Sequence, residues 1–477
     1  MIDAQLVVVG GGPGGYAAAF LAADMGLTVA LVDPEVNPGG VCVYRGCIPS
    51  KALLHVAKLI DESRHAKAWG IEFNEPKIDL AKLRDFKNNV VKRLTSGTGQ
   101  LVKHRKVMYL QGMAEIVDAH NLKVKLSAGA TEDVRFEHAI LATGSAPAIP
   151  ASLKIDDARV MDSTAALDLP DIPKSLLVVG GGYIGLELGT VYATLGSAVT
   201  VVEMTPGLLP GADRDLVDIL AKRVVTIMKN VWLETRVVHM QAEAKGIRVT
   251  FEGKGGSPGG EVPKDQLFDR VLVAVGRRPN SGIPGLDKTR VQVDQRGFIM
   301  ADEQRRTHEA SIFAIGDVVG EPMLAHKASH EGRVAVEVIA GENVAFAPRA
   351  IPAVVFTDPE IAWAGMTEMQ AAKENRTVTV AKFPWGASGR AITLDRTDGL
   401  TKLILDPATE RILGVGIVGA GAGELIAEGV LAIEMGANAT DLKLSIHPHP
   451  TLTETVMESA EVFFGQSTHV FRPKRQK

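Results

Sequence analysis

The chain has 477 residues, enough for about three domains of ordinary size. Its net charge of −4 gives no basic footprint for nucleic acid, and we expect the short basic end, 472–477, to be a solvated tail. No apolar run approaches the roughly 20 residues of a membrane span, and the start lacks a signal-peptide pattern. We therefore expect a cytoplasmic protein with no membrane span and no nucleic-acid partner.

A glycine-rich turn follows a short apolar strand at the start of the chain. Residues 6–9 are apolar, and Gly10, Gly12 and Gly15 then form the pattern G-x-G-x-x-G before a helix of small residues. Asp33 ends a second apolar strand, 23 positions after Gly10. This order predicts a dinucleotide site, in which glycines let the backbone approach a pyrophosphate and the acid accepts hydrogen bonds from a ribose.

The only two cysteines of the chain, Cys42 and Cys47, come next. A disulfide between them would close so small a loop that it would stabilise the fold little. No second Cys/His pair completes a zinc site, so we expect no metal. We interpret the pair as a working dithiol/disulfide couple, with two buried free thiols as the alternative that the spacing alone leaves open.

The glycine pattern returns 170 positions later. Gly180, Gly182 and Gly185 repeat G-x-G-x-x-G, and Glu203 stands 23 positions after Gly180. Glycine turns that bind nothing are the alternative, but two full copies, each with its acid, favour two dinucleotides. The cysteines follow the first copy, which predicts FAD there and the nicotinamide at the second. Because Glu203 favours a free 2′-hydroxyl and no basic residue follows until Arg214, we expect NAD rather than NADP.

The rest of the chain suggests how the domains are arranged. Apolar strands at 138–142 and 271–275 each end in a glycine turn and would close one nucleotide fold. The predicted class is α/β, with two Rossmann-like dinucleotide-binding domains and a C-terminal α+β dimerisation domain. The predicted domains are a discontinuous FAD-binding domain (1–150 and 277–346), an NAD-binding domain (151–276) and a dimerisation domain (347–477). Short expected elements are a loop at 254–263, strands at 353–356, 400–405 and 412–418, and a helix at 424–435.

Taken together, these motifs resemble those of the flavin-dependent disulfide reductases (class I pyridine nucleotide–disulfide oxidoreductases), and among them the dihydrolipoamide dehydrogenases. The segments that carry the resemblance are 10–15, 39–51, 142–144, 180–203, 312–317 and 447–454. Tyr44 and Tyr183 depart from the pattern of the dihydrolipoamide dehydrogenases. The resemblance implies NAD-dependent oxidation of protein-bound dihydrolipoamide, as a component of 2-oxoacid dehydrogenase or glycine cleavage complexes. The alternative is a related flavoprotein reductase of another low-molecular-weight disulfide.

The resemblance also implies roles for residues at the site. Cys47 would lie against the flavin and Cys42 would face the substrate. His449 would be the base, oriented by Glu454, and both would reach the cysteine pair of a partner subunit in a homodimer. Without the resemblance, His449 would be interpreted as a turn residue. Lipoyl domains of an acyltransferase or an H-protein would be the partners.

Other residues would hold the cofactors. The resemblance implies an ion pair of Lys51 and Glu187 beside the flavin, with an ordinary surface pair as the alternative. Further expected FAD contacts are Gly14, Gly40, Val41, Gly112, Ala114, Thr143, Gly144, Ser145, Asp317, Met323, Leu324, Ala325 and His326. Further expected NAD contacts are Tyr183, Ile184, Val237, Ala274 and Gly276, and Arg277 is a further expected cofactor contact.

Overall fold

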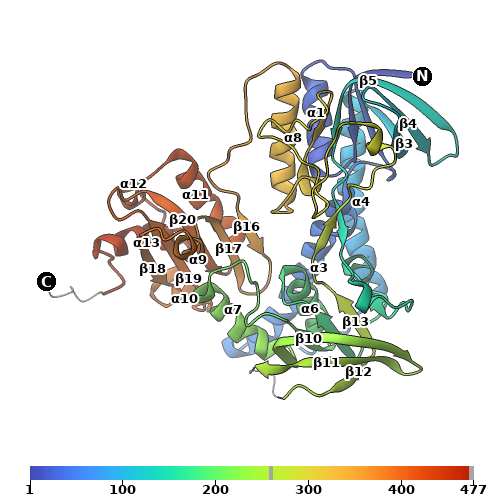
Figure 1. The fold of residues 1–477 in the computed structure, drawn as a ribbon. Coiled ribbons are helices and arrows are strands. Elements are labelled where there is room, and N and C mark those ends of the chain that lie inside the picture. The colour runs from blue at the N-terminus through green and yellow to red at the C-terminus, as the bar shows by residue number, and fades with distance from the viewer. Residues whose placement is uncertain (257–260, 472–477) are drawn as a thin grey trace.

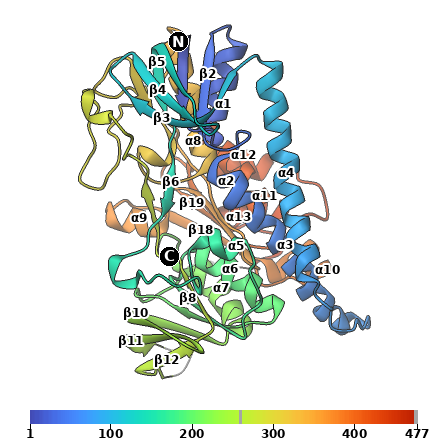
Figure 2. The same ribbon diagram turned by 90° about the vertical axis from the view of Figure 1, so that its right-hand side faces the viewer.

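The computed structural model describes residues 1–256 and 261–471 and arranges them around three main β-sheets (Figure 1). Two sheets contain the repeated glycine patterns, and the third lies to one side of both (Figures 1 and 2). The predicted tail 472–477 and part of the predicted loop 254–263 lie outside the described residues. No helix in the described part of the chain is long and apolar enough to cross a membrane.

The first sheet has a parallel core in the order β3-β2-β1-β5-β15, to which β4 adds antiparallel pairings. Its strands are β1 (Ile2–Val9), β2 (Val29–Asp33), β3 (Met108–Ile116), β4 (Asn121–Leu126), β5 (Thr131–Leu141) and β15 (Ile312–Ala314). The central strands are continuous apolar runs because both faces of a parallel sheet are covered. The helices α1 (Pro13–Asp24) and α8 (Ala325–Ile339) lie side by side against it (Figures 1 and 2).

The second sheet repeats this plan. Its parallel core has the order β10-β9-β8-β13-β7, and β11 and β12 continue it as antiparallel strands. The strands are β7 (Val160–Met161), β8 (Ser175–Val179), β9 (Ala198–Val202), β10 (Asn230–Glu243), β11 (Gly246–Gly256), β12 (Asp265–Phe268) and β13 (Arg270–Val273). Helix α6 (Tyr183–Leu195) follows β8 as α1 follows β1. The predicted duplication is therefore present in the order of the strands as well as in the glycine turns.

The chain crosses between the two nucleotide-binding folds twice, and the crossings pair with each other. β6 (Ser145–Pro147) and β14 (Arg277–Pro279) form a short antiparallel pair. Beside it, Thr143 Oγ1 donates to Asn280 O at 2.8 Å, and Asn280 Nδ2 donates to Thr143 O at 3.0 Å. These bonds hold the two folds together next to the first glycine turn.

The third sheet is antiparallel, in the order β16-β17-β20-β19-β18. Its strands are β16 (Ala353–Val355), β17 (Glu360–Gly365), β18 (Thr379–Pro384), β19 (Leu400–Leu405) and β20 (Ile412–Gly419). The expected helix at 424–435 lies within α11 (Ala422–Met435), which packs on this sheet. This mixture of helices and antiparallel strands confirms the predicted α+β character of the C-terminal part.

Shorter elements complete the architecture. The remaining helices are α2 (Gly40–Arg45), α3 (Cys47–His65), α4 (Leu80–His104), α5 (Ser163–Leu167), α7 (Arg214–Ile227), α9 (Glu368–Lys373), α10 (Gly389–Thr393), α12 (Ala439–Leu444) and α13 (Glu454–Phe464). Short 3-10 helices are η1 (Ala66–Trp69), η2 (Ala151–Leu153), η3 (Leu286–Lys288), η4 (Gly316–Val318) and η5 (Trp385–Ala387). The predicted α/β class with two Rossmann-like folds is confirmed, while the exact domain boundaries stay predictions.

Candidate active site

A cavity of about 670 Å³ opens beside the first glycine turn. Its walls come from that turn, the cysteine segment, the two crossings and the start of α6. The predicted site residues that line it are Gly10, Gly12, Gly14, Gly15, Asp33, Gly40, Val41, Cys42, Cys47, Lys51, Gly112, Ala114, Thr143, Gly144, Ser145, Tyr183, Ile184, Glu187, Arg277, Asp317, Met323 and Ala325. Among these, Tyr183 and Ile184 belong to α6 of the second fold, so the cavity extends from the first fold to the second.

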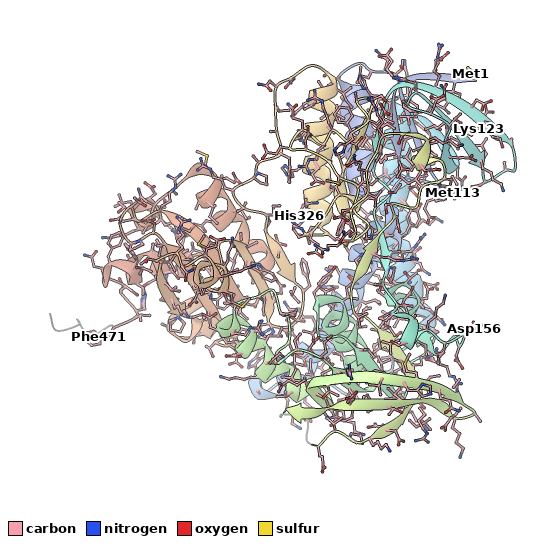
Figure 3. The ribbon with its side chains drawn as sticks, in the orientation of Figure 1. Met1, Met113, Lys123, Asp156, His326 and Phe471 are labelled. Atoms are coloured by element: carbon pink, nitrogen blue, oxygen red, sulfur yellow. The ribbon has the colours of Figure 1, made fainter. Side chains whose placement is uncertain are left out.

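The other predicted site residues lie outside the lining of this cavity. They are Gly180, Gly182, Gly185, Glu203, Val237, Ala274, Gly276, Leu324, His326, His449 and Glu454. Figure 3 shows His326 on the side of the first fold that faces the third sheet, and its Nε2 lies 2.8 Å from Pro352 O. The assignments of Leu324 and His326 to the flavin, and of Val237 to the nicotinamide, stay predictions.

The first glycine turn packs closely against the backbone that follows β5. Gly10 has φ +108°, and a Cβ on it would overlap the carbonyl of Ala142. A Cβ on Gly15 would overlap the carbonyl of Gly10, so both positions require glycine. Asp33 Oδ2 accepts a hydrogen bond from Gly11 N at 2.5 Å, and Oδ1 accepts one from Glu35 N at 2.9 Å. The acid thus holds the turn as well as facing the cavity, and burial raises its pKa.

The second turn repeats these contacts almost atom for atom. Gly180 has φ +111° and lies against Ala274 O as Gly10 lies against Ala142 O. Glu203 accepts from Gly181 N at 2.7 Å and from Thr205 N at 2.8 Å. A Cβ on Gly182 would meet nothing within 4 Å, which leaves open space where the pyrophosphate of a dinucleotide would lie.

Arg214, the first basic residue after Glu203, is already engaged by the backbone. Its guanidinium donates to the carbonyls of Leu208 at 2.8 Å, Leu209 at 2.6 Å and Ala212 at 2.5 Å. Four of the five N–H donors of this guanidinium are bonded to these carbonyls, which hold it at the backbone of residues 208–212. This geometry agrees with the expected preference for NAD over NADP.

The two cysteines are free thiols that line the cavity. Cys42 lies in α2, and Cys47 is the first residue of α3, where the helix N-terminus favours a thiolate. The hydrogen bond from Cys42, aided by the nearby Lys51 ammonium, outweighs burial and lowers the pKa of Cys47 to about 7. The pKa of Cys42 is raised, mainly because its thiol donates that hydrogen bond and because it is buried. These opposite shifts favour a thiol at Cys42 and a thiolate at Cys47.

An ion pair stands beside the cysteines. Lys51 Nζ lies 2.8 Å from Glu187 Oε2 and 4.5 Å from the centre of the Phe356 ring. Glu187 is 4% exposed, and its other oxygen accepts from Phe356 N at 3.0 Å. The alternative of an ordinary surface pair does not describe this contact. The carboxylate joins the first fold, the second fold and the third sheet at one point next to the cavity.

A second set of hydrogen-bonded side chains lines another wall of the cavity. Ser145 Oγ donates to Asp317 Oδ2 at 2.5 Å, and Arg277 Nε donates to Ser145 Oγ at 2.8 Å. The backbone beside Asp317 is held by Glu331, which is fully buried and accepts from Gly316 N at 2.6 Å. Glu331 was not predicted from the sequence, because its partner Arg305 comes close to it only in the fold. Its other partner, Lys327, lies one helical turn before it on α8.

His449 and Glu454 pair with each other, away from the cysteines of their own chain. His449 Nδ1 lies 2.9 Å from Glu454 Oε1, and Thr451 N donates to Glu454 Oε2 at 2.8 Å. Although burial opposes it, hydrogen bonds from Thr451 and His449 lower the pKa of Glu454, which keeps it ionised. The side chain of His449 is 73% exposed, so its second nitrogen is open to a partner. His447 instead pairs with Glu428 at 2.6 Å.

The two tyrosines noted as departures have different surroundings. Tyr183, the first residue of α6, lines the cavity, and burial raises its pKa to about 12. Tyr44 points elsewhere, since its hydroxyl donates to Asn37 O at 2.9 Å. Lining residues that were not predicted from the sequence include Glu35, Arg45, Ser50, Met113, Ser163, Leu167, Leu188 and Asn280. Arg45, which lies between the cysteines and pairs with Glu35, could have been singled out by its position.

The residues present fit a flavin dinucleotide in this cavity. Glycine turns, an acid at the end of β2 and the start of α1 provide the features that a bound dinucleotide requires. A volume of about 670 Å³ lies within the usual range of ligand sites. The second turn, with its open position at Gly182 and its acid Glu203, fits a second dinucleotide.

Comparison with known proteins agrees with this site. Residues 4–332 match the family described as pyridine nucleotide-disulphide oxidoreductase, and residues 351–460 match its dimerisation domain. The chain belongs to the pyridine nucleotide-disulphide oxidoreductase family. This membership confirms the predicted oxidoreductase class, and with it FAD and NAD as cofactors. The dimerisation-domain match supports the predicted homodimer.

Individual relatives of this oxidoreductase chain extend the likeness over its whole length. It is 48% identical to a protein of Haemophilus influenzae named dihydrolipoyl dehydrogenase, covering 100% of this chain and 98% of the relative. A protein of Geobacillus stearothermophilus with the same name is 44% identical, with 98% of each chain covered. Among solved structures, LpdA of Mycobacterium tuberculosis is 26% identical with a TM-score of 0.88, over 97% of this chain and 99% of that chain.

Proposed function

We propose that this protein is a dihydrolipoyl dehydrogenase, which oxidises protein-bound dihydrolipoamide to lipoamide and reduces NAD⁺. The observation that carries the proposal is the position of Cys42 and Cys47, which line the cavity that joins the two nucleotide folds, with Cys47 at the N-terminus of α3. Full-length relatives with 40–48% identity that bear this name support it.

The first half of the reaction forms a mixed disulfide. In the oxidised enzyme, Cys42 and Cys47 share a disulfide bond. His449 takes a proton from one substrate thiol at Nε2, because Nδ1 is engaged by Glu454. The substrate thiolate attacks Cys42 Sγ, the bond between the two cysteines breaks, and Cys47 leaves as a thiolate, which its low pKa favours.

The second half releases lipoamide. The remaining substrate thiol attacks the sulfur bound to Cys42, and Cys42 leaves and takes up the proton of that thiol, consistent with its raised pKa. The protein then holds a Cys42 thiol, a Cys47 thiolate and a protonated His449. FAD, held by the first glycine turn and Asp33, would supply the acceptor for this electron pair beside Cys47, with NAD⁺ as the final oxidant. The Lys51 ammonium, held by Glu187, lies where it stabilises negative charge next to the cysteines.

The base comes from a second copy of the chain in this proposal. His449 and Glu454 lie outside the cavity that contains the cysteines of their own chain, and the His449 side chain is exposed. A homodimer that brings His449 to the Cys42–Cys47 pair of the partner subunit completes the site. The lipoyl group would arrive on the lipoyl domain of an acyltransferase or an H-protein in the cytoplasm, which stays the expected location.

A steady-state comparison of substrates tests the proposal. The rate is measured with dihydrolipoamide and NAD⁺ or NADP⁺, and in the other direction with glutathione disulfide and NADH or NADPH. We expect kcat/KM for dihydrolipoamide with NAD⁺ to exceed every other combination by about 100-fold or more. A higher kcat/KM for glutathione disulfide would instead support the alternative, a reductase of another small disulfide.

A further inference from the structure

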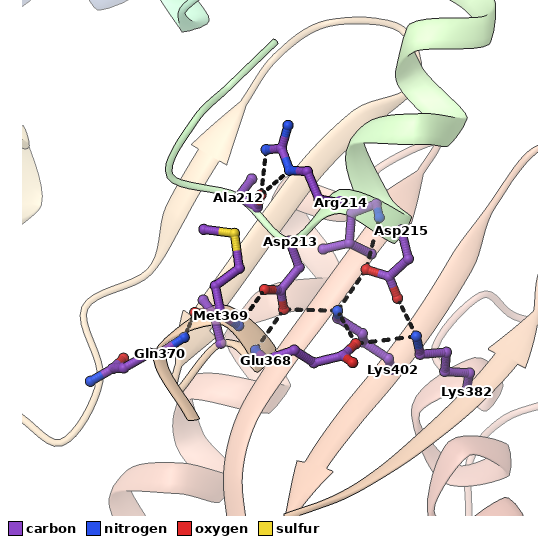
Figure 4. Close-up of polar contacts among 11 residues, drawn as sticks. Ala212, Asp213, Arg214, Asp215, Glu368, Met369, Gln370, Lys382 and Lys402 are labelled. Carbon is purple, nitrogen blue, oxygen red and sulfur yellow. Dashed lines mark hydrogen bonds and ion pairs between the residues drawn. The ribbon is translucent and has the colours of Figure 1, made fainter. Parts of the chain in front are cut away.

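A partly buried ion cluster, with Lys402 and Asp213 as its buried members, joins the second nucleotide-binding fold to the third sheet (Figure 4). It consists of Asp213, Asp215, Glu368, Lys382 and Lys402, and we name it the Lys402 cluster. Lys402 lies on β19, and its side chain is 1% exposed. Its Nζ lies 2.8 Å from Asp213 Oδ2, 2.7 Å from Asp215 Oδ1 and 2.7 Å from Glu368 Oε1. An ammonium has three N–H donors, and each has a carboxylate here.

A second lysine stands directly across the sheet. Lys382 on β18 pairs in register with Lys402, an arrangement that would be repulsive by itself. Its Nζ lies 2.6 Å from Asp215 Oδ2 and 3.1 Å from Glu368 Oε1. Although burial opposes both shifts, these contacts raise the pKa of Lys382 and lower that of Asp215. Within the described residues, Lys382 makes no ion pair with Asp213, so of the two lysines only Lys402 pairs with that carboxylate.

Asp213 connects the two parts of the molecule. It precedes α7 in the second fold, but its side chain makes no capping bond to that helix. Its oxygens instead accept from Glu368 N at 2.9 Å and Met369 N at 3.1 Å, the first two residues of α9. The side chain of Asp213 is therefore held by the part of the chain that contains the third sheet, through Lys402 and the start of α9.

The segment just before Asp213 covers the second glycine turn. Leu209 N donates to Gly181 O at 3.1 Å, and a Cβ on Gly181 would overlap the Leu208 side chain. The carboxylate that would meet the ribose, Glu203, also holds Gly181 N, at 2.7 Å. Residues 204–212 therefore run from the acid of the dinucleotide site, across its turn, to the residue that Lys402 holds.

We infer that Asp213 and Lys402 are positioning residues for the nicotinamide dinucleotide. Lys402 fixes Asp213, Asp213 fixes the end of 204–212, and that segment keeps the Gly181 turn and Glu203 in place for the adenosine half of NAD. The second nucleotide site thus depends on a lysine of the third sheet that does not itself reach the dinucleotide. The inference rests on the proposed binding of NAD at the second turn.

Two matched variants of the FAD-loaded protein test this inference. ADP-ribose, the half of NAD that carries no reacting ring, is titrated calorimetrically into the oxidised Lys402→Met and Lys382→Met proteins. We expect Lys402→Met to raise the Kd for ADP-ribose about tenfold, since a displaced Glu203 carboxylate would lose about one hydrogen bond to the ribose. Lys382→Met should stay within about twofold of the unaltered protein, because Lys382 does not hold Asp213.

Steady-state kinetics of the same variants separate positioning from general stability. Lys402→Met should raise KM for NAD⁺ in parallel with the Kd, while kcat, KM for dihydrolipoamide and flavin content change less than about twofold. Asp213→Asn is the second variant. It takes the cluster from a net charge of −1 (three carboxylates, two ammonium groups) to 0, so it leaves no extra buried charge, and it should weaken ADP-ribose binding in the same direction.

Three results would overturn the inference. They are equal effects of Lys402→Met and Lys382→Met on the Kd, ADP-ribose binding by Asp213→Asn that matches the unaltered protein, and a fall in melting temperature with no change in Kd. If Lys402→Met fails to fold, the Asp213→Asn titration decides. Because ADP-ribose binding is measured without any thiol substrate, a protein that does not oxidise dihydrolipoamide fails the proposed function, while the titration still tests the roles of Asp213 and Lys402.

Discussion

The two nucleotide-binding folds share a plan and differ in what surrounds it. Both have the same parallel strand order, a glycine turn at positive φ and an acid that holds the turn. The first turn opens into a cavity walled by the cysteines, the crossings and α6, whereas Gly182 of the second faces open space. The same glycine turn therefore suits a permanently bound cofactor in the first fold, where other segments enclose it. In the second fold, where Gly182 faces open space, it suits a dinucleotide that binds and dissociates.

The surroundings also decide where the chemistry takes place. The first fold carries the thiol and thiolate pair and the Lys51–Glu187 ion pair, next to its glycine turn. The second fold has Glu203 and an arginine, Arg214, that is engaged by backbone carbonyls. These residues support the proposal that the first fold serves the sulfur chemistry and that the second recognises NAD. Variants that change one of these tasks and spare the other can separate them.

The largest effect is expected from Cys42→Ser. Loss of the sulfur that forms the mixed disulfide should lower dihydrolipoamide oxidation by about 10³-fold or more. Reduction of an artificial electron acceptor by NADH, which needs only the flavin and the second fold, should stay within about twofold. Flavin content from the absorbance spectrum serves as the control for folding. Equal loss of both activities would mean that the two folds do not divide the work as described.

A smaller loss is expected from His449→Gln. Removing a general base typically costs a factor of about 10²–10⁴ in rate, and kcat for dihydrolipoamide should fall within this range. His447→Gln is the matched control two residues away, since His447 pairs with Glu428 rather than Glu454. It should retain activity within about threefold. If the two variants lost the same activity, His449 would have no special role as the base.

The smallest effect concerns the pH at which Cys47 ionises. In the reduced protein, the thiolate absorbance in the ultraviolet, taken as a difference from Cys47→Ser, should rise with a midpoint near pH 7. Cys42→Ala removes the hydrogen bond that contributes most to the low pKa, so its midpoint should move up toward the ~8.5 of an ordinary thiol.

The linked stability has a definite sign. Because the pKa of Cys47 is lower in the folded than in the unfolded protein, its ionisation stabilises the folded state at a pH above the unfolded pKa. This stabilisation is lost as the pH falls through the folded pKa of about 7. The reduced protein should therefore gain stability between about pH 7 and 8.5 relative to Cys47→Ser. If the thiolate absorbance of the unaltered protein instead rose with a midpoint near pH 8.5, this result would contradict the assignment of Cys47 as the thiolate.

Local patterns in the sequence were sufficient to predict both glycine turns. The strand before each turn, the helix after it and the acid 23 positions on are set by residues close together in the chain. The strands at 400–405 and 412–418 were also predictable, because each is a short local run rich in apolar residues. The resemblance supplied what spacing could not, the roles of Cys42, Cys47 and His449.

Residue spacing alone does not predict contacts between distant segments. Lys51 meets Glu187 across 136 positions, a pair that only the family resemblance predicted. Lys402 meets Asp215 across 187 positions, and nothing in the sequence indicated that pair. Nothing near Lys402 in the chain marks it as buried, since a lysine within a strand is usually exposed. The acids Asp33 and Glu203 were expected to serve a ribose, but their bonds to the backbone of their own turns depend on geometry that only the fold provides.

One matched pair of variants tests the difference between the two folds most directly. Gly12 and Gly182 occupy equivalent positions with φ of −72° and −78°, and an added Cβ would meet only Gly40 Cα, at 3.9 Å, in the first case and nothing within 4 Å in the second. Alanine therefore fits the protein at both positions, and its methyl group would obstruct only a bound pyrophosphate.

The measurement is the flavin content of Gly12→Ala and Gly182→Ala, together with ADP-ribose binding to the flavin-loaded protein. We predict that Gly12→Ala is purified with much less FAD, while Gly182→Ala keeps its FAD and binds ADP-ribose at least about tenfold more weakly. The assignment of the two folds would be reversed if Gly182→Ala lost its FAD, or if Gly12→Ala kept all of its FAD but bound ADP-ribose more weakly.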